Sequence, residues 1–67
     1  MKLIKNYECE REPTKEEIAL GKKIADKEDC IVNLKWFVNY SGWYNIRIEK
    51  GTTFDECMEQ IPKCYPV

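Results

Sequence analysis

Between Cys30 and Lys50 the chain alternates apolar and polar side chains, which is the two-residue period of a half-buried β-strand. Ser41 and Gly42 interrupt the alternation and separate two segments, so the pattern predicts an antiparallel hairpin. The apolar rows of the two segments are Cys30, Val32, Leu34, Trp36, Val38 and Tyr40, and Tyr44, Ile46 and Ile48.

The register of this hairpin follows from which side chains each possible pairing would bury. A two-residue turn at Ser41 and Gly42 would place the polar row of the second segment on the apolar face. We therefore predict either a connection one residue longer, residues 41–43, or a bulge near the tip, and both place Trp43 in the loop and leave it exposed. The pairs in this register are Tyr40 with Tyr44, Val38 with Ile46, Trp36 with Ile48, Lys35 with Glu49 and Phe37 with Arg47.

Two helices are predicted from capping boxes, in which a threonine is followed three residues later by a glutamate. These boxes are Thr14 with Glu17 and Thr53 with Glu56. The first helix should span residues 15–27, with Gly21 in its apolar stripe indicating a close approach of a strand or ring. Its stripe comprises Ile18, Leu20, Ile24 and Ala25, and that of the second helix comprises Phe54, Cys57, Met58 and Ile61, before the helix ends at Pro62.

Residues 2–9 can add a strand before the first helix, which gives the order β-α-β-β-α. The fold class predicted is therefore α+β: one small domain, residues 1–67, with the hairpin packed on two helices. The hairpin is either alone or part of a three-stranded sheet, and an α-β-β-α core without the first strand is the alternative. A chain of 67 residues lies near the lower limit for folding alone.

The charges are nearly balanced, with 11 basic and 12 acidic residues and a formal net charge of −1. This balance disfavours a surface dominated by nucleic-acid attraction. Acidic residues are frequent in the first quarter of the chain, which contains Glu8, Glu10, Glu12, Glu16 and Glu17. They form either part of a solvated face with mixed charges or a patch that attracts a basic partner.

The sequence has no apolar run long enough for a signal peptide or a membrane span. We therefore expect a cytoplasmic protein that does not contact a membrane. The chain begins with Met, and we expect a complete small open reading frame of a size common in phages and mobile elements.

Four cysteines raise the question of metal or disulfides, but their successive intervals are 21, 27 and 7 residues. Structural zinc sites usually use pairs separated by two to four residues, and the chain has no histidine to complete a set. We expect reduced thiols, no metal and no cofactor, with a disulfide framework as the alternative. Without histidine or a glycine-rich phosphate loop, we also expect that the protein is not an enzyme.

Five of the eight aromatic residues fall within nine positions, which points to a recognition surface near the hairpin tip: Trp36, Phe37, Tyr40, Trp43 and Tyr44. We assign Trp36, Tyr40 and Tyr44 to the core. Trp43 and Phe37 are expected outside the core, where they can form a binding interface. One alternative is that Phe37 contacts Arg47 across the strands, and another is that a further element of the domain covers this face.

The resulting hypothesis is a protein-binding module, specifically a phage or mobile-element protein that binds and inhibits a host protein. Its expected partner-binding residues are Trp43, Phe37, Arg47, Lys35 and Asn39, with Glu10 and Glu12 attracting a basic surface. The alternative is a hairpin that binds single-stranded nucleic acid, in which the rings stack on bases and Lys35, Arg47 and Lys50 contact phosphates.

Overall fold

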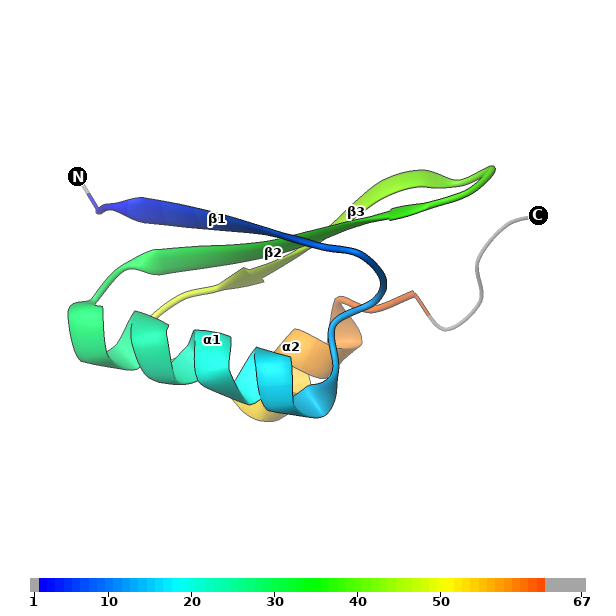
Figure 1. The fold of residues 1–67 in the computed structure, drawn as a ribbon. Helices are drawn as coiled ribbons and strands as arrows, with labels where there is room; N and C mark the ends of the chain where they lie inside the picture. The colour runs from blue at the N-terminus through cyan, green and yellow to red at the C-terminus, as the bar shows by residue number, and fades with distance from the viewer. Residues whose placement is uncertain (1, 63–67) are drawn as a thin grey trace.

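The computed structural model describes residues 2–62 and shows a small α+β domain with the order β-α-β-β-α. Its elements are β1 (Ile4–Cys9), α1 (Lys15–Glu28), β2 (Ile31–Val38), β3 (Gly42–Ile48) and α2 (Phe54–Glu59). The strands form one sheet in the order β1-β2-β3, in which β1 is parallel and β3 antiparallel to β2. Both helices lie on the same side of the sheet (Figure 1). The predicted fold is confirmed, with the first strand included in the sheet.

The core lies between the two helices and the strand faces that point toward them. Its fully buried members include Ile18, Ala25, Val32, Trp36, Ile46, Ile48 and Cys57. Ile24 and Phe54 are partly buried against this cluster, as the helical stripes predict. The assignment of Leu20 to the core is wrong, because this side chain is 59% exposed beside β1 at the margin of the helical stripe.

Both predicted capping boxes are present. The Glu17 amide donates to the Thr14 hydroxyl at 3.2 Å, and the Thr14 amide donates to the Glu17 carboxylate at 2.8 Å. The same reciprocal pair joins Thr53 and Glu56. Helix α1 ends at Asp29, whose φ of 49° is left-handed, and this matches the predicted stop.

The predicted hairpin register is wrong by four residues, although the face assigned to each side chain in the strands is right. Ile46 lies opposite Leu34 rather than Val38, and Tyr44 lies opposite Trp36. The connection is residues 39–41, and Tyr40 takes the left-handed conformation there with a φ of 72°. A shift of four residues preserves the alternation between faces, so burial alone did not distinguish the two registers.

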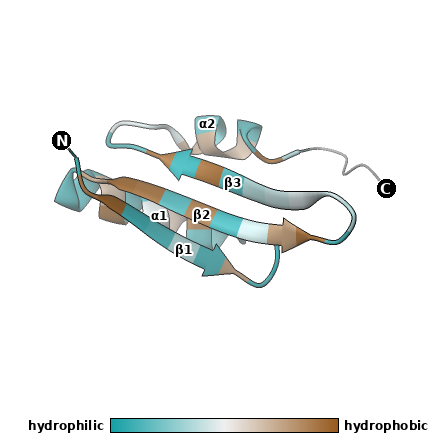
Figure 2. Ribbon diagram, turned by 90° about the horizontal axis from the view of Figure 1, so that it is seen from above, coloured by the Kyte–Doolittle hydropathy of each residue, from teal (hydrophilic) through white to brown (hydrophobic). Residues whose placement is uncertain are grey.

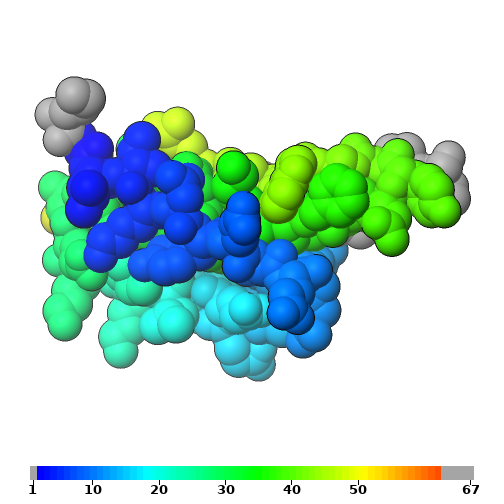
Figure 3. Space-filling view, turned by 45° about the horizontal axis from the view of Figure 1, so that its top comes forward, coloured from blue at the N-terminus to red at the C-terminus, as the bar shows by residue number. Residues whose placement is uncertain are grey.

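The observed turn also corrects two aromatic assignments. Tyr40 is 92% exposed at the tip rather than in the core. Trp43 is exposed as predicted, but it belongs to β3 and not to the loop. The tip of the hairpin projects beyond the helices, and no helix or strand of residues 2–62 covers the face of the sheet opposite them (Figures 1 and 3). No helix in residues 2–62 is long and apolar enough to cross a membrane.

Candidate partner-binding surface

Two aromatic rings face each other on the uncovered face of the sheet. Phe37 in β2 lies directly opposite Trp43 in β3, with ring centroids 5.5 Å apart and planes inclined by 66°. This is the edge-to-face arrangement that aromatic quadrupoles favour. The residues remain 49% and 57% exposed, so each ring is held by the other while a large part of its surface contacts solvent. Together with Tyr40 at the tip, we call these residues the aromatic patch.

Lys35 extends this surface toward the centre of the sheet. Its Nζ lies 5.8 Å from the centroid of the Trp43 ring, within the range of a cation–π contact. Lys35 is opposite Asn45, whose side chain is exposed. The lysine is thus positioned by a strand and an aromatic face, and its ammonium group borders the aromatic patch.

Arg47 lies on the same face but further from the rings than predicted. It is opposite Asn33, and its Nη2 is 3.0 Å from the Glu49 carboxylate. The predicted pairing of Arg47 with Phe37 is therefore wrong, and the same four-residue shift accounts for it. Arg47 is exposed and borders the patch through Asn45 rather than contacting Phe37.

The acidic connection after β1 lies next to the hairpin. Glu10 and Glu12 line a shallow surface depression together with Phe37 and Asn39. The parallel pairing of β1 with β2 explains this proximity, because Cys9 lies beside Trp36 at the end of the ladder. Four of the seven predicted binding residues therefore share one depression, although they come from two distant parts of the sequence.

Trp36 has the opposite role from its neighbour Phe37. It is fully buried on the helix side and stacks on Tyr44, with centroids 5.7 Å apart and an interplanar angle of 26°. Its indole N–H is buried without a hydrogen-bond acceptor in the described part of the chain. Trp36 therefore belongs to the core, and the rings on the two faces of the sheet have separate structural and surface roles.

A pair of asparagines forms the polar centre of the uncovered face. The Asn33 side-chain amide donates to Asn6 Oδ1 at 3.1 Å and so joins β2 to β1. Asn33 Oδ1 is buried and accepts no hydrogen bond from residues 2–62. The uncovered face is therefore polar at its centre and aromatic near the tip of the hairpin.

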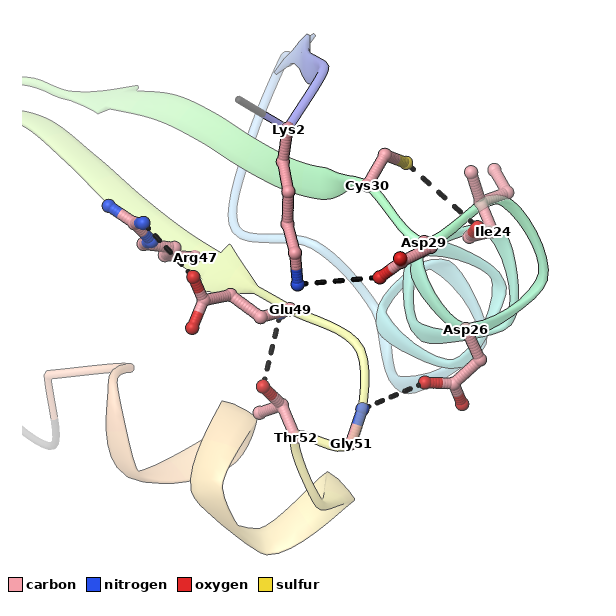
Figure 4. Close-up of polar contacts among 9 residues, drawn as sticks. All are labelled: Lys2, Ile24, Asp26, Asp29, Cys30, Arg47, Glu49, Gly51 and Thr52. Atoms are coloured by element: carbon pink, nitrogen blue, oxygen red, sulfur yellow. Dashed lines mark hydrogen bonds and ion pairs between the residues drawn. The ribbon is translucent and has the colours of Figure 1, made fainter.

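The polar contacts at the other end of the sheet have a structural role (Figure 4). Asp26 accepts hydrogen bonds from Lys22 at 2.9 Å and from the Gly51 amide at 3.1 Å, which joins α1 to the loop after β3. The Lys22 contact, followed by the Gly51 amide, lowers the pKa of the Asp26 carboxyl. These contacts hold α1 and the loop after β3 together.

The described cysteines are free thiols in different environments. Cys30 and Cys57 are buried, and Cys9 is partly buried. Burial raises the pKa of the Cys9 and Cys57 thiols, which disfavours reactive thiolates. Residues 2–62 contain no group of three or more acidic or cysteine side chains that could hold a metal ion. Cys64 lies outside the described residues.

The sequence reasoning missed Tyr40 as a surface residue. The signal that could have identified it is local, because Tyr40 directly precedes Ser41 and Gly42, both typical of turns. Arg11 was also missed, and it lines the same depression as Glu10 and Glu12.

Comparison with protein-family models, curated proteins and solved structures found no match to this chain. The assignment of the surface therefore depends on the residues and geometry described above.

Proposed function

We propose that the protein is a non-enzymatic protein-binding module that contacts its partner through the aromatic patch and its polar border. The observation that carries this proposal is the pair formed by Phe37 and Trp43, which are held edge-to-face and half-exposed on an uncovered sheet face. Large aromatic side chains fixed in this way are typical of the residues that dominate binding energy at protein interfaces.

The strand positions favour recognition because they restrict the rings before binding. Phe37 and Trp43 are both in regular strands, and Lys35 is directed at the Trp43 ring. A partner would therefore need to immobilise few additional side chains, which reduces the entropic cost of association. Tyr40 at the exposed turn adds apolar area that can adapt to the partner.

The charges around the patch define the kind of surface that fits it. Lys35 lies on one side of the rings, and Glu10 and Glu12 lie beside Phe37 on another. A complementary partner would present an apolar pocket for the rings, an acidic group near Lys35 and basic groups near the two glutamates. Such a module would act by covering a functional surface of its partner, which is the inhibitory role expected from the sequence.

Binding of single-stranded nucleic acid is the second candidate. The arrangement that favours it is the placement of Lys35 and Asn45 beside two rings on one sheet face, where bases could stack. The net charge of −1 and the glutamates beside Phe37 oppose the approach of phosphates. Protein binding is therefore the better-supported function.

The test compares partner capture by the wild-type protein with capture by Trp43→Ala and Lys35→Ala. Lys23→Ala is the matched control for Lys35→Ala, because Lys23 is an exposed lysine on α1, on the opposite side of the sheet. A partner isolated from cell lysate should be retained by Lys23→Ala, and its affinity for Trp43→Ala should fall at least about 30-fold, which corresponds to about 2 kcal/mol.

Equal affinity for all four proteins would contradict the assignment of the patch. An oligonucleotide titration at low and moderate salt distinguishes nucleic-acid binding from protein binding. If the protein binds the oligonucleotide through Trp43, and this affinity falls steeply with salt, nucleic-acid binding becomes the better-supported function.

A further inference from the structure

Apolar side chains are also exposed along the β1 edge of the sheet, away from the aromatic patch. Of the seven large hydrophobic residues exposed in residues 2–62, three form the patch. The other four lie along β1 and the adjacent side of α1: Leu3, Ile4, Tyr7 and Leu20. A shallow groove between these two elements is lined by Tyr7, Leu20 and Ile24, with Glu17 at its rim.

The backbone of β1 has an unpaired outer edge at this surface. The Ile31 amide donates to the Leu3 carbonyl at 2.9 Å, which fixes the alternation of the parallel ladder. Alternate residues then direct their backbone groups toward β2, and Ile4, Asn6 and Glu8 direct theirs outward. No backbone partner for these three outward-facing residues occurs in the described part of the chain. In Figure 2, no helix or strand of the described residues lies beyond β1.

The opposite edge of the sheet is partly closed. The Gln60 side chain accepts a hydrogen bond from the Arg47 amide at 2.8 Å and donates one to the Arg47 carbonyl at 2.9 Å. The Glu49 amide donates to the Thr52 hydroxyl at 3.1 Å. Helix α2 lies along this side of β3 (Figure 2). The sheet is therefore protected against strand addition along the second half of β3 and open along β1.

We propose that a second copy of this chain pairs with the edge of β1, antiparallel and about a twofold axis through Asn6. In this register Asn6 lies opposite Asn6 of the partner subunit, and Ile4 lies opposite the partner's Glu8. These pairs use all three residues whose backbone groups point outward. Shifting the register by two residues in either direction pairs only two of these three residues with one another.

The charges along β1 favour an antiparallel second copy as the occupant. Lys2 precedes the strand and Lys5 lies in its first half, where they contact Asp29 and Glu28 of the same chain. Glu8 lies near the end of the strand, and Glu10 follows it. A copy that runs in the opposite direction brings the basic end of one strand against the acidic end of the other, with Lys2 opposite the partner's Glu10. A parallel copy would set like charges together.

The side chains on the helix side also fit this arrangement. Lys5 lies opposite the partner's Tyr7 in a non-hydrogen-bonded pair, which is the closer of the two pair types. At this separation the aliphatic part of the Lys5 side chain can cover the ring of the partner's Tyr7. The two β1 strands would form the centre of a continuous six-stranded sheet. Because the axis is perpendicular to the sheet, both aromatic patches would lie on the same face.

The experiment measures the mass of the purified full-length protein by sedimentation equilibrium across a wide concentration range. The wild-type protein should change reversibly from monomer to dimer. Ile4→Glu places a carboxylate opposite the partner's Glu8 and should weaken the dimer at least about tenfold, whereas Ile4→Lys places an opposite charge there and should retain it. Adding Glu8→Lys to Ile4→Glu should restore association, and circular dichroism confirms that each variant is folded.

The pairing itself is tested by isotope-filtered NOEs in a mixed labelled and unlabelled sample. Close contact is expected between the Hα atoms of Lys5 and the partner's Tyr7, because they form a non-hydrogen-bonded pair. A protein that is monomeric at every concentration would overturn the proposal. So would a dimer that responds equally to Ile4→Glu and Ile4→Lys, or one that lacks this NOE.

Discussion

Gly21 in α1 lies directly against Ile48 in β3. A Cβ atom at Gly21 would be 3.0 Å from Ile48 Cδ1, and Val32 and Leu34 would lie 3.5 and 3.7 Å away. Ile48 is fully buried, so it has little freedom to move aside. The glycine therefore determines how closely the first helix approaches the sheet.

We predict that Gly21→Ala destabilises the protein by about 1 kcal/mol. Overpacking a filled core costs about 1–3 kcal/mol, and the better helix propensity of alanine offsets about 0.5–1 kcal/mol of that. Urea denaturation measures the free energy of unfolding. Ala19→Gly is the control, since Ala19 is exposed on the same helix and reports the propensity effect alone. A more stable Gly21→Ala variant would show that the helix can shift away from Ile48.

Tyr40 provides the second prediction, because its φ of 72° is unfavourable for a residue with a Cβ atom. The Ser41 amide donates to the Val38 carbonyl at 3.1 Å, so Tyr40 occupies the third position of a β-turn that favours glycine. We predict that Tyr40→Gly is about 1 kcal/mol more stable than Tyr40→Ala in urea denaturation. Equal stabilities of these two variants would show that the turn relaxes to a conformation without this strain.

The sequence predicts each face of the hairpin but not its register, and the reason lies in Ile46. Burial of Ile46 is satisfied equally opposite Val38 and opposite Leu34, since both point toward the helices. The choice depends on the turn, where Tyr40 adopts the left-handed conformation although a glycine, Gly42, is two residues away. A strained tyrosine in a turn cannot be inferred from residue preferences, which place glycine or asparagine there.

The surface was predictable in its members but not in its arrangement. Phe37 falls on the polar row of the hairpin, and this predicted its exposure correctly. The contact of Phe37 with Trp43 depends on the register and was missed. The position of Glu10 and Glu12 beside Phe37 depends on the parallel alignment of β1 with β2, and no local pattern encodes that alignment.

The carboxyl groups of Asp26 and Glu56 give a pH-dependent prediction. Hydrogen bonds from Lys22 and the Gly51 amide lower the pKa of Asp26 below its usual 3.8, and the Thr53 amide and hydroxyl lower that of Glu56 below 4.5. Lowered pKa values mean that these groups stabilise the fold above the unfolded-state pKa and lose this effect as pH falls through the folded-state pKa. The free energy of unfolding should therefore decrease between about pH 5 and about pH 2.

The matched variants for this effect are Asp26→Asn and Glu56→Gln, which remove the titrating groups and keep similar shapes. Glutamine at the fourth position of a capping box still accepts from the backbone. The double variant should lose less stability on acidification than the wild-type protein in urea denaturation at each pH. The same steep loss in both proteins would assign the acid sensitivity to other carboxyl groups.

The cysteines should remain reduced and metal-free, with Cys30 and Cys57 protected from reagents in the folded state. Both are buried, and burial raises the pKa of the Cys57 thiol. Intact mass spectrometry under native conditions should give a mass without zinc and without the loss of two units per disulfide. Alkylation followed by peptide mapping should modify Cys9 before Cys30 and Cys57. Rapid modification of Cys57 in the folded protein would contradict its burial.

Gln60 should protect the outer backbone edge of the second half of β3 from solvent. Its side chain makes both hydrogen bonds to the backbone of Arg47, in place of a neighbouring strand. We predict that Gln60→Ala lowers the free energy of unfolding by about 1 kcal/mol, the usual net effect of losing exposed hydrogen bonds. It should also accelerate hydrogen exchange of the Arg47 amide, which donates to Gln60. Glu59→Ala, at the neighbouring exposed position, should leave both quantities nearly unchanged. If Arg47 exchange is as slow in Gln60→Ala as in the wild-type protein, another group protects this edge.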